Sequence, residues 1–391
     1  MSGDRRVVLT GAGVVSPLGD TGAALHAALL AGRSALSPVT LFPTDGLPAF
    51  LVGELAGFDA QASLGEGNLR PLDRISRMVV VAAERALTAS GFSRPLRAGR
   101  EVGLVLGTML SGVRTIAEFD RRGLTRGPSY VSPLDFANTV INAAAGQTAI
   151  WHDLRGVNST IAGSAASGLQ AIASAVDLIR SGRADALLAG GADELCYETL
   201  LGFARTGRLC GAGVRPLPFD PRRSGFALAE GAALVMLEEA ESAAARGAVV
   251  LAEVRGHGTA FDRSRGADPA RAARAVTRAL VAALDDAGLQ PEAIDALSAA
   301  ANGSVLGDAA EAAGIAAVFP GRPGRPPKDL PISAVKGLLG EALGAGGALQ
   351  VIDLLETMRE SVAVRHALID AMGFDGQHAA VVLARPDGSG R

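Results

Sequence analysis

The sequence predicts an α/β fold built from two related units. Its 391 residues are too many for one small core, and 48% of them are hydrophobic. Short β-branched runs alternate with Ala-rich stretches, which is typical of helices layered on sheets. Several runs are almost continuously apolar and bounded by glycine, as strands covered on both faces are. Two sets of strands indicate a duplication with a seam near residues 243–248.

The first unit is placed at residues 1–245. Its expected strands are 7–10, 102–106, 159–162, 186–189 and 233–237. Helices are expected over 73–90 and 168–180, between these strands. The uneven polarity that follows the second strand predicts an insertion at about 108–150.

The second unit is placed at residues 246–391. Its expected strands are 249–256, 294–299, 332–335, 366–370 and 379–383, and its helices are 269–287 and 344–357. The helix at 269–287 has a clear start signal, because Asp268 can cap it and Pro269 suits its first position. A loop rich in Pro and Gly is expected at 321–331.

The composition excludes several classes of protein. A formal net charge of −3 and an aromatic content of 4% argue against a nucleic-acid partner. Two cysteines, Cys196 and Cys210, are too few for a disulfide framework or a four-thiolate metal site. No apolar run is long enough for a signal peptide or a membrane span, so a soluble, cytoplasmic protein is expected.

The segment VVLTGAGVVSPLGD at 7–20 contains a GAG that invites a nucleotide-binding interpretation. The dinucleotide fingerprint needs a third glycine and an uninterrupted helix start, and Pro17 stands in the way. A tight turn from strand to loop is therefore favoured.

The segment NSTIAGSAASGLQA at 158–171 has the shape of a nucleophile elbow, in which a sharp turn raises one side chain to a helix N-terminus. The apex is Ala165, which carries no nucleophile. Ser164 and Ser167 flank it and are favoured as turn and capping hydroxyls. Serine hydrolase chemistry at either hydroxyl remains a weaker alternative.

Three further glycine-rich segments carry polar residues. They are AAANGSVLGD with Asn302 and Asp308, ISAVKGLLGEALGAGG with Lys336 and Glu341, and GFDGQH with His378. For Lys336 and Glu341, ordinary surface charges or a packing pair across the loop are both open. His378 is expected to be structural, within a glycine turn before the last strand.

Taken in order, these segments resemble the motifs of the β-ketoacyl-carrier-protein synthases, the condensing enzymes of fatty-acid and polyketide synthesis. The longest block, RPLPFDPRRSGFALAEGAALVMLEEAESAAARGA, is similar to their RPFD, GF, GEGA and LVLE run. NSTIAGSAASG resembles their ACTSG elbow, ISAVKGLLGEALGAGG their SxKSxxGHxxGAAG motif, and GFDGQHAAVVL their GFGGxNAxxxL motif. The resemblance spans residues 6–384. It implies a thiolase-like fold, a duplicated αβαβα core of five layers, and a dimer across a sheet edge.

The family's chemistry uses a Cys thiolate that takes the acyl chain and two histidines that support decarboxylation and stabilise the enolate and oxyanion. By the resemblance, the Cys falls on Ala165 and the histidines fall on Asn302 and Glu341. Lys336 is retained, and an expected partner carboxylate is replaced by Gln350. No acyl-enzyme can form at Ala165, and an anionic Glu341 would repel an enolate.

This pattern resembles the non-catalytic chain-length factor, or ketosynthase β subunit, of type II polyketide synthases. The resemblance implies a heterodimer with an active ketosynthase α subunit, access to an acyl carrier protein through the complex, and a tunnel whose bulk limits chain length. It implies no cofactor, no metal, no nucleic acid and no membrane. Two alternatives stay open: a loading ketosynthase homologue that decarboxylates malonyl-carrier, and a homodimeric acyl-binding scaffold. Ala165, where aromatic-polyketide members carry Gln, leaves a reducing, polyene-making system open.

The resemblance also implies where the tunnel lies. The stretch GTMLSGV at 107–113 is expected to face it, with Met109 and Leu110 as gates, although ordinary core packing is equally open for both. An interface helix is expected over 132–146, with Phe136 as a contact. Asp308 and Phe374 count, with Lys336, as retained motif residues.

Overall fold

The computed structural model describes residues 5–65, 67–92, 101–319 and 330–386 of the chain. The loop expected at 321–331 lies outside these residues, except for its last two positions. Among the helices of the described residues, none combines the length and the apolar character that a membrane crossing needs.

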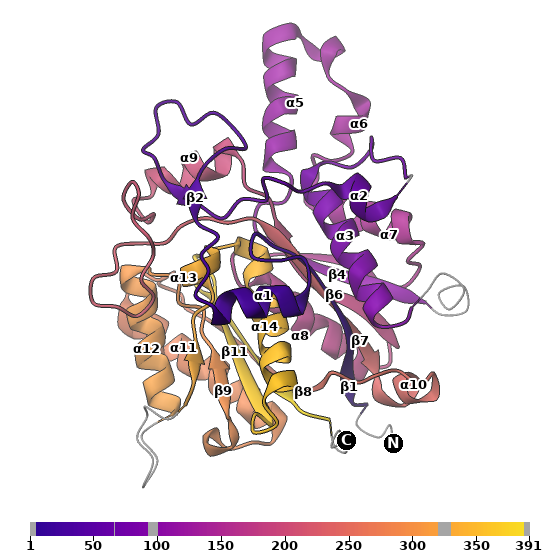
Figure 1. Cartoon of the computed structure of the whole chain (residues 1–391), viewed down its shortest axis with the longest axis vertical. Helices are drawn as coiled ribbons and strands as arrows, with labels where there is room; N and C mark the ends of the chain where they lie inside the picture. The colour runs from indigo at the N-terminus through magenta and orange to yellow at the C-terminus, as the bar shows by residue number, and fades with distance from the viewer. Residues whose placement is uncertain (1–4, 66, 93–100, 320–329, 387–391) are drawn as a thin grey trace.

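The described structure is built on one large mixed sheet, which runs through both of its halves (Figure 1). Its ten strands lie in the order β10-β9-β11-β12-β8-β1-β7-β6-β4-β5. Their bounds are β1 (Val7–Val15), β4 (Val102–Thr108), β5 (Asn158–Ala162), β6 (Ala186–Asp193), β7 (Gly231–Glu239), β8 (Ala252–Phe261), β9 (Ala296–Ser298), β10 (Ile332–Ser333), β11 (His366–Met372) and β12 (Gln377–Ala384). A separate antiparallel pair joins β2 (Ser37–Pro38) to β3 (Leu51–Val52).

The strand order is symmetric about the junction between β1 and β8. From β1 outward, β7 and β6 follow through antiparallel pairings, and β4 and β5 through parallel ones. From β8 outward, β12 and β11 follow through antiparallel pairings, and β9 and β10 through parallel ones. The same five-strand pattern therefore occurs twice, and the predicted duplication is confirmed.

Helices complete five layers around the two halves of the sheet. Their bounds are α1 (Gly22–Leu30), α2 (Ala60–Leu64), α3 (Arg74–Ala89), α5 (Val113–Arg126), α6 (Pro133–Phe136), α7 (Ala143–His152), α8 (Ser167–Arg180), α9 (Tyr197–Arg205), α10 (Ala240–Ala245), α11 (Pro269–Ala287), α12 (Val305–Val318), α13 (Lys336–Leu339) and α14 (Gly346–Glu360). Helices α8 and α14 pack on each other and on strands of both halves, and so form the middle layer. Helices α3 and α7 cover the first half, and α11 and α12 cover the second. Helix α11 has the predicted bounds, and the Asp268 side chain caps it as expected.

Glycines at the middle layer allow its segments to approach closely. A Cβ at Gly168, at the start of α8, would lie 2.2 Å from the Gly344 carbonyl oxygen, and one at Gly191 would lie 2.0 Å from it. A Cβ at Gly107 would lie 2.3 Å from the Ser167 backbone. Because only glycine fits at such distances, these residues bring the elbow, the ends of β4 and β6, and the segment before α14 together.

The turn expected at GAG is wrong. These residues lie inside β1, which continues to Val15 with a register irregularity between Leu9 and Gly11. A Cβ at Gly11 would lie 2.5 Å from the Ala86 carbonyl oxygen, and one at Gly13 would lie 2.0 Å from that of Ala82. The two glycines therefore serve the close packing of α3 on the sheet, not a change of chain direction.

The single helix expected over 132–146 is also wrong. Helix α6 is capped by Ser132 and ends at Phe136, and α7 begins only at Ala143. The intervening Asn138 side chain donates to the Pro71 carbonyl oxygen, which ties this stretch to the body of the protein. Helices α5 and α6 project from the top of the molecule in Figure 1, and α5 has no buried residue.

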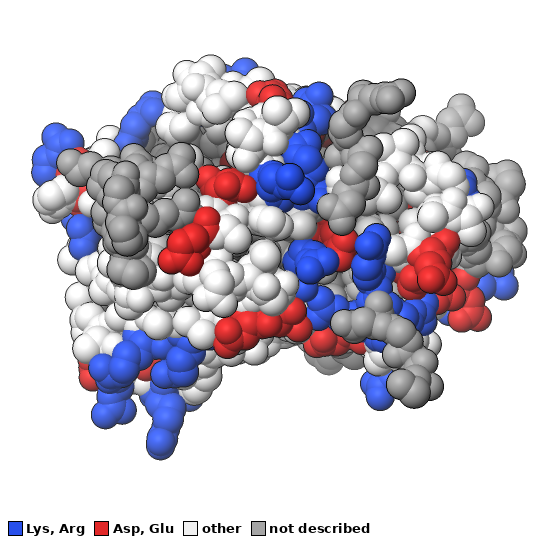
Figure 2. All heavy atoms as spheres, turned by 90° about the horizontal axis from the view of Figure 1, so that it is seen from below, with Lys and Arg blue, Asp and Glu red and all other residues white. Residues whose placement is uncertain are grey.

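The charges on the face seen in Figure 2 are mixed. Basic and acidic side chains lie next to one another there. Where its described residues are seen, this face is therefore not uniformly positive.

Candidate functional site

The predicted elbow is present between β5 and α8. The chain leaves β5 at Ala162, turns, and enters α8 at Ser167. Ser164 has a φ of +122°, which is unusual for a residue with a side chain and shows how sharp the turn is. Ala165 follows it and is fully buried. The turn therefore presents a methyl group at the position where the resemblance places a thiol.

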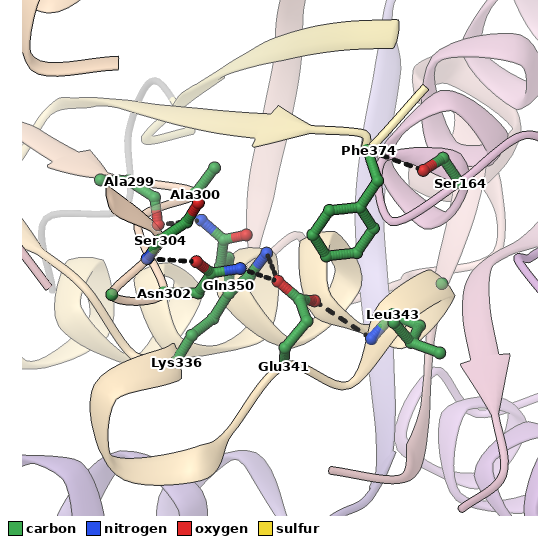
Figure 3. Close-up of polar contacts among 12 residues, drawn as sticks. Ser164, Ala299, Ala300, Asn302, Ser304, Lys336, Glu341, Leu343, Gln350 and Phe374 are labelled. Carbon is green, nitrogen blue, oxygen red and sulfur yellow. Dashed lines mark hydrogen bonds and ion pairs between the residues drawn. The ribbon is translucent and has the colours of Figure 1, made fainter. Parts of the chain in front are cut away.

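The two serines of the elbow hold the turn. Ser167 Oγ donates to the Ser164 carbonyl oxygen at 2.6 Å. Ser164 Oγ accepts the backbone N–H of Phe374 at 2.7 Å, as Figure 3 shows. These contacts match the turn role predicted for the hydroxyls and link the elbow to the GFDG segment. The predicted capping role is wrong, because the N-cap residue of α8 is Ala166 and no side chain caps the helix there.

Glu341 is the centre of a buried polar cluster (Figure 3). Lys336 Nζ lies 2.9 Å from Glu341 Oε2, and Asn302 Nδ2 donates to the same oxygen at 2.8 Å. The backbone N–H of Leu343 donates to the other oxygen, Oε1, at 3.1 Å. Lys336 and Glu341 are thus a packing pair, and the alternative of two surface charges is wrong. All three donors point at Glu341 and not into open space.

Asp308 shapes the loop that carries Asn302. Its carboxylate accepts the backbone N–H groups of Asn302, Gly303 and Phe219 at 2.9–3.3 Å. Burial raises the pKa of Asp308, while these same backbone hydrogen bonds lower it. The Asn302 side chain is therefore placed by a buried carboxylate at the start of α12.

Gln350 occupies the position where the resemblance expects a carboxylate. Its Nε2 donates to the Ala299 carbonyl oxygen at 2.8 Å, to that of Asp370 at 3.1 Å and to that of Ser298 at 3.2 Å. The amide thus ties together the chain that follows β9 and strand β11. Because this side chain is neutral, it gives Lys336 no opposite charge, whereas Glu341 contacts Lys336 directly.

Glu311 and Asp370 form a buried acidic pair that the sequence did not reveal. Burial raises the pKa of both carboxyls, and the Asp370 carboxylate raises that of Glu311 further. The two carboxyls thus lie close enough to influence each other's titration. Glu311 follows Asp308 by one helical turn on α12, and this spacing was the one available signal.

A cavity of about 260 Å³ lies beside the Asn302 loop. Its lining includes Arg208, Asn302, Phe374 and His378, but neither Ala165 nor Glu341. Burial lowers the pKa of His378 to about 4, so this histidine is neutral near pH 7 and fits the structural role expected for it.

Phe374 belongs to an aromatic group at the wall of this cavity. Its ring stacks on Phe226 at 5.2 Å and meets Phe203 edge-on at 5.4 Å. The Arg208 guanidinium lies 5.7 Å from the ring centre. In Figure 3 the ring points from the Ser164 side toward Glu341, so it stands between the elbow and the polar cluster.

Met109 and Leu110 are half-buried just after β4. Both pack against an apolar cluster that includes Leu343 and Phe226, and Phe374 packs against the same cluster. They therefore combine core packing with a place beside the site. Phe136 lies on α6, is 62% exposed and packs on Phe119 with ring centres 5.8 Å apart.

Neither cysteine serves the site. Cys196 lies at the start of α9, 3.3 Å from the Thr199 hydroxyl, and burial raises the pKa of its thiol to about 12. Cys210 donates to the Gly225 carbonyl oxygen, and burial raises the pKa of this thiol too. Both thiols stay protonated near neutral pH and are not nucleophiles there.

Comparisons with known proteins agree with this geometry. The model of the "Beta-ketoacyl synthase, N-terminal domain" matches residues 4–243, and that of the C-terminal domain matches residues 251–370. The 3-oxoacyl-[acyl-carrier-protein] synthase 2 of Coxiella burnetii is 33% identical over 364 residues, which are 92% of this chain and 87% of that protein. The synthase 2 of Vibrio cholerae is 30% identical over 97% of this chain and 99% of its own length.

Solved structures give the same result. The ishigamide ketosynthase/chain length factor matches 98% of this chain and 100% of its own, with a TM-score of 0.91 and 29% identity. A type II polyketide synthase ketosynthase, solved with its acyl-carrier protein and bound to a hexaketide, matches 98% of this chain and 100% of its own, with a TM-score of 0.87 and 25% identity. With both family models covering most of its length, the chain belongs to the β-ketoacyl synthase family.

Proposed function

We propose that this chain is a non-catalytic chain-length factor that pairs with an active ketosynthase in a type II polyketide synthase. One observation carries the proposal. Lys336, Asn302 and the Leu343 amide all donate to the Glu341 carboxylate. A site that stabilises an enolate or an oxyanion needs donors that are aimed at the reacting oxygen, and here they are already satisfied by a protein anion. With Ala165 at the elbow, the site also has no nucleophile.

The surface around β5 supports a partner subunit. Strand β5 is an end strand of the large sheet and, within the described residues, pairs only with β4. An open edge of this kind can accept a strand from another chain. Exposed apolar side chains lie on α7, which contacts β5, and on α6 and the stretch between the two helices: Leu134, Phe136, Val140, Ile141 and Ile150. Exposed apolar residues that gather in one region mark protein interfaces. The structural match named ketosynthase/chain length factor favours an active ketosynthase as the partner.

The place of Met109 and Leu110 supports control of chain length. They lie beside Phe374 and Leu343, close to the residues that correspond to the family's catalytic positions. In a complex, side chains here limit how far a growing chain extends, because added bulk in a close-packed tunnel is excluded. The acyl carrier protein reaches this chain through the complex.

Co-expression with a ketosynthase from the same genome that keeps the Cys and both histidines tests the proposal. We expect a heterodimer by sizing, and a polyketide whose length changes when the tunnel residues of this chain change. A chain that remains a homodimer and leaves the product unchanged would contradict the proposal and favour the acyl-binding scaffold.

Two assays on the isolated chain cover the enzymatic alternatives. Release of CO₂ from malonyl-carrier would favour the decarboxylase alternative. Labelling of Ser164 or Ser167 by a fluorophosphonate would favour the hydrolase. Neither signal is expected, since both hydroxyls are engaged in the turn and the donors of the site serve Glu341.

A further inference from the structure

The chain between β4 and α5 is held by a single buried carboxylate. Asp193, the last residue of β6, accepts the backbone N–H groups of Met109, Leu110 and Ser111 at 2.7–3.0 Å. It also accepts the Thr108 hydroxyl at 2.8 Å. Three consecutive amides and the side chain before them thus converge on one carboxylate, so the backbone of the two candidate gate residues has a single fixed path.

The same carboxylate reaches the segment before α14. Asp193 Oδ2 accepts the backbone N–H of Gly344 at 2.8 Å, next to the 2.7 Å contact from Met109. Leu343, the residue before it, donates its own N–H to Glu341. Asp193 therefore ties the gate residues to the segment that carries the site, with no intervening residue.

Glu194, the residue after Asp193, extends the contacts of Asp193 to α5. Glu194 Oε1 accepts the backbone N–H of Arg114, in the first turn of α5, at 3.2 Å. Asp73 Oδ2 accepts the Thr115 hydroxyl at 3.3 Å, and a Cβ at Gly112 would lie 2.6 Å from the same oxygen. Residues 108–115 are thus held at one end by Asp193 and at the other by the carboxyl groups of Glu194 and Asp73. Ser111, in the middle, has a φ of +52°, a conformation that a residue with a side chain adopts only when its surroundings impose it.

We propose that Asp193, assisted by Glu194, is a positioning residue for product length: it fixes the backbone of Met109 and Leu110 and so fixes where their side chains stand in the tunnel. The inference rests on the proposed function. Steric selection between chains that differ by two carbons needs a wall that moves by less than the size of the group it excludes. A half-buried loop without an anchor would not meet that need, whereas five donors on one carboxylate do.

Asp193→Asn is the direct test, because it keeps the size of the side chain. In the wild-type chain, both carboxylate oxygens accept hydrogen bonds from N–H groups. The amide nitrogen of the variant replaces one of these oxygens, and it cannot accept a hydrogen bond from the N–H group that faces it. Thr108→Val is a milder second variant that removes one of the donors. Asp353→Asn is the matched control, since Asp353 is also a buried carboxylate but contacts His26 between α14 and α1, at 2.7 Å.

The first measurement is hydrogen exchange in the purified chain. In Asp193→Asn, we expect exchange in peptides covering 108–115 to rise roughly tenfold or more, while peptides of α11 keep their rate. Thr108→Val should show a smaller rise in the same peptides, and Asp353→Asn should show none. Unchanged exchange at 108–115 in both test variants would overturn the positioning role.

The second measurement is the product distribution of the complex with the active ketosynthase. Asp193→Asn and Thr108→Val should broaden the distribution of chain lengths, while Asp353→Asn leaves it as sharp as in the parent complex. A merely structural role would lower the total yield without broadening the distribution, and that result would overturn the inference.

Met109→Trp in the same complex separates this inference from the proposed function. If Met109→Trp shortens the product but the anchor variants leave the distribution sharp, Asp193 is not a specificity residue and the chain-length role stands. If Met109→Trp leaves the product unchanged, Met109 is not a gate and the inference fails, whereas the proposed function fails only if this chain forms no heterodimer with the ketosynthase.

Discussion

Lys336 Nζ lies 2.9 Å from Glu341 Oε2, and both side chains are almost completely buried. The residue at 350, where the family resemblance implies a carboxylate, is a neutral amide engaged with backbone carbonyls. Glu341 therefore supplies the carboxylate that contacts the buried lysine. This contact makes Glu341 part of the stability of the site.

Removing the charge of Glu341 should destabilise the fold. Glu341→Gln removes the carboxylate that contacts the buried Lys336, which then keeps a longer-range interaction with Asp370. Breaking such a buried pair costs about 3–5 kcal/mol of unfolding free energy. Urea unfolding followed by circular dichroism measures this loss. Asp153→Asn is the control, since its pair with Arg155 is exposed and should leave the midpoint unchanged. Equal urea midpoints for Glu341→Gln and Asp153→Asn would show that the buried Lys336–Glu341 pair does not contribute to stability.

A thiol at the elbow should not restore catalysis. In Ala165→Cys the nucleophile returns, but Lys336, Asn302 and the Leu343 amide still donate to Glu341. We expect no condensation product from acyl- and malonyl-carrier, and little acyl adduct by intact-protein mass spectrometry. Ala165→Ser serves as the control for added bulk. Steady condensation by Ala165→Cys alone would show that the contacts with Glu341 do not block the chemistry of the site.

The bulk of the gate residues should set the length of the product. In the complex with an active ketosynthase, Met109→Ala or Leu110→Ala should lengthen the polyketide, and Trp at either position should shorten it. Product masses measure this directly. Leu124→Ala is the control, because Leu124 on α5 is 87% exposed and should leave the length as it is. The same length in all gate variants would place the limiting wall elsewhere.

Glu194 should make the stability depend on pH. Burial first, and then the nearby Asp73 and Glu230 charges, raise its pKa from the ordinary 4.5 to about 8. Between these values the folded chain keeps a proton that the unfolded chain has released, so stability falls as the pH rises. Glu194→Gln, whose amide oxygen can still accept the Arg114 N–H, should flatten this decline. Unfolding free energies of the parent chain and of Glu194→Gln at pH 5 and pH 8 measure this difference. The same fall in stability for both proteins would contradict the prediction.

The exposed apolar surface of α6 and α7 should carry the partner. Phe136→Asp places a charge there and should reduce the amount of ketosynthase that co-purifies with this chain. Val362→Asp is the matched control, since Val362 is 80% exposed and lies before β11, away from α6. Equal recovery of the partner with both variants would place the interface on another face.

The regular elements were predictable because their patterns are local. All ten predicted strands are found, although β1, β6 and β8 extend further than their apolar runs indicated. Helix α11 combined a cap, a proline at its start and a steady apolar face, and its bounds agree with the prediction. Glycine was the ambiguous residue: in GAG it serves the packing of α3 on β1, and its sequence neighbours do not distinguish this from a turn.

The polar contacts of the site were less predictable because each joins distant parts of the chain. The motif order placed Asn302, Lys336 and Glu341 in two segments, but no pattern showed that they share one hydrogen-bond cluster. In the sequence, Asp193 is one of two adjacent acidic residues with no distinguishing pattern around it. Its five hydrogen-bond donors come from residues 108–111, which precede it, and from Gly344, which follows it. Such partners depend on how the layers stack, which local propensity does not encode.

The central position of β1 has a consequence for how the protein is made. The first strand of the chain, at Val7–Leu9, lies between β7 and β8, whose paired residues come more than two hundred positions later. A ribosome therefore releases this apolar strand long before either neighbour exists, and its backbone and side chains stay unpaired during most of synthesis. Closure of the sheet must be a late and slow step because its contacts are so far apart in the sequence. Chaperone binding to nascent chains should therefore persist until β8 has emerged.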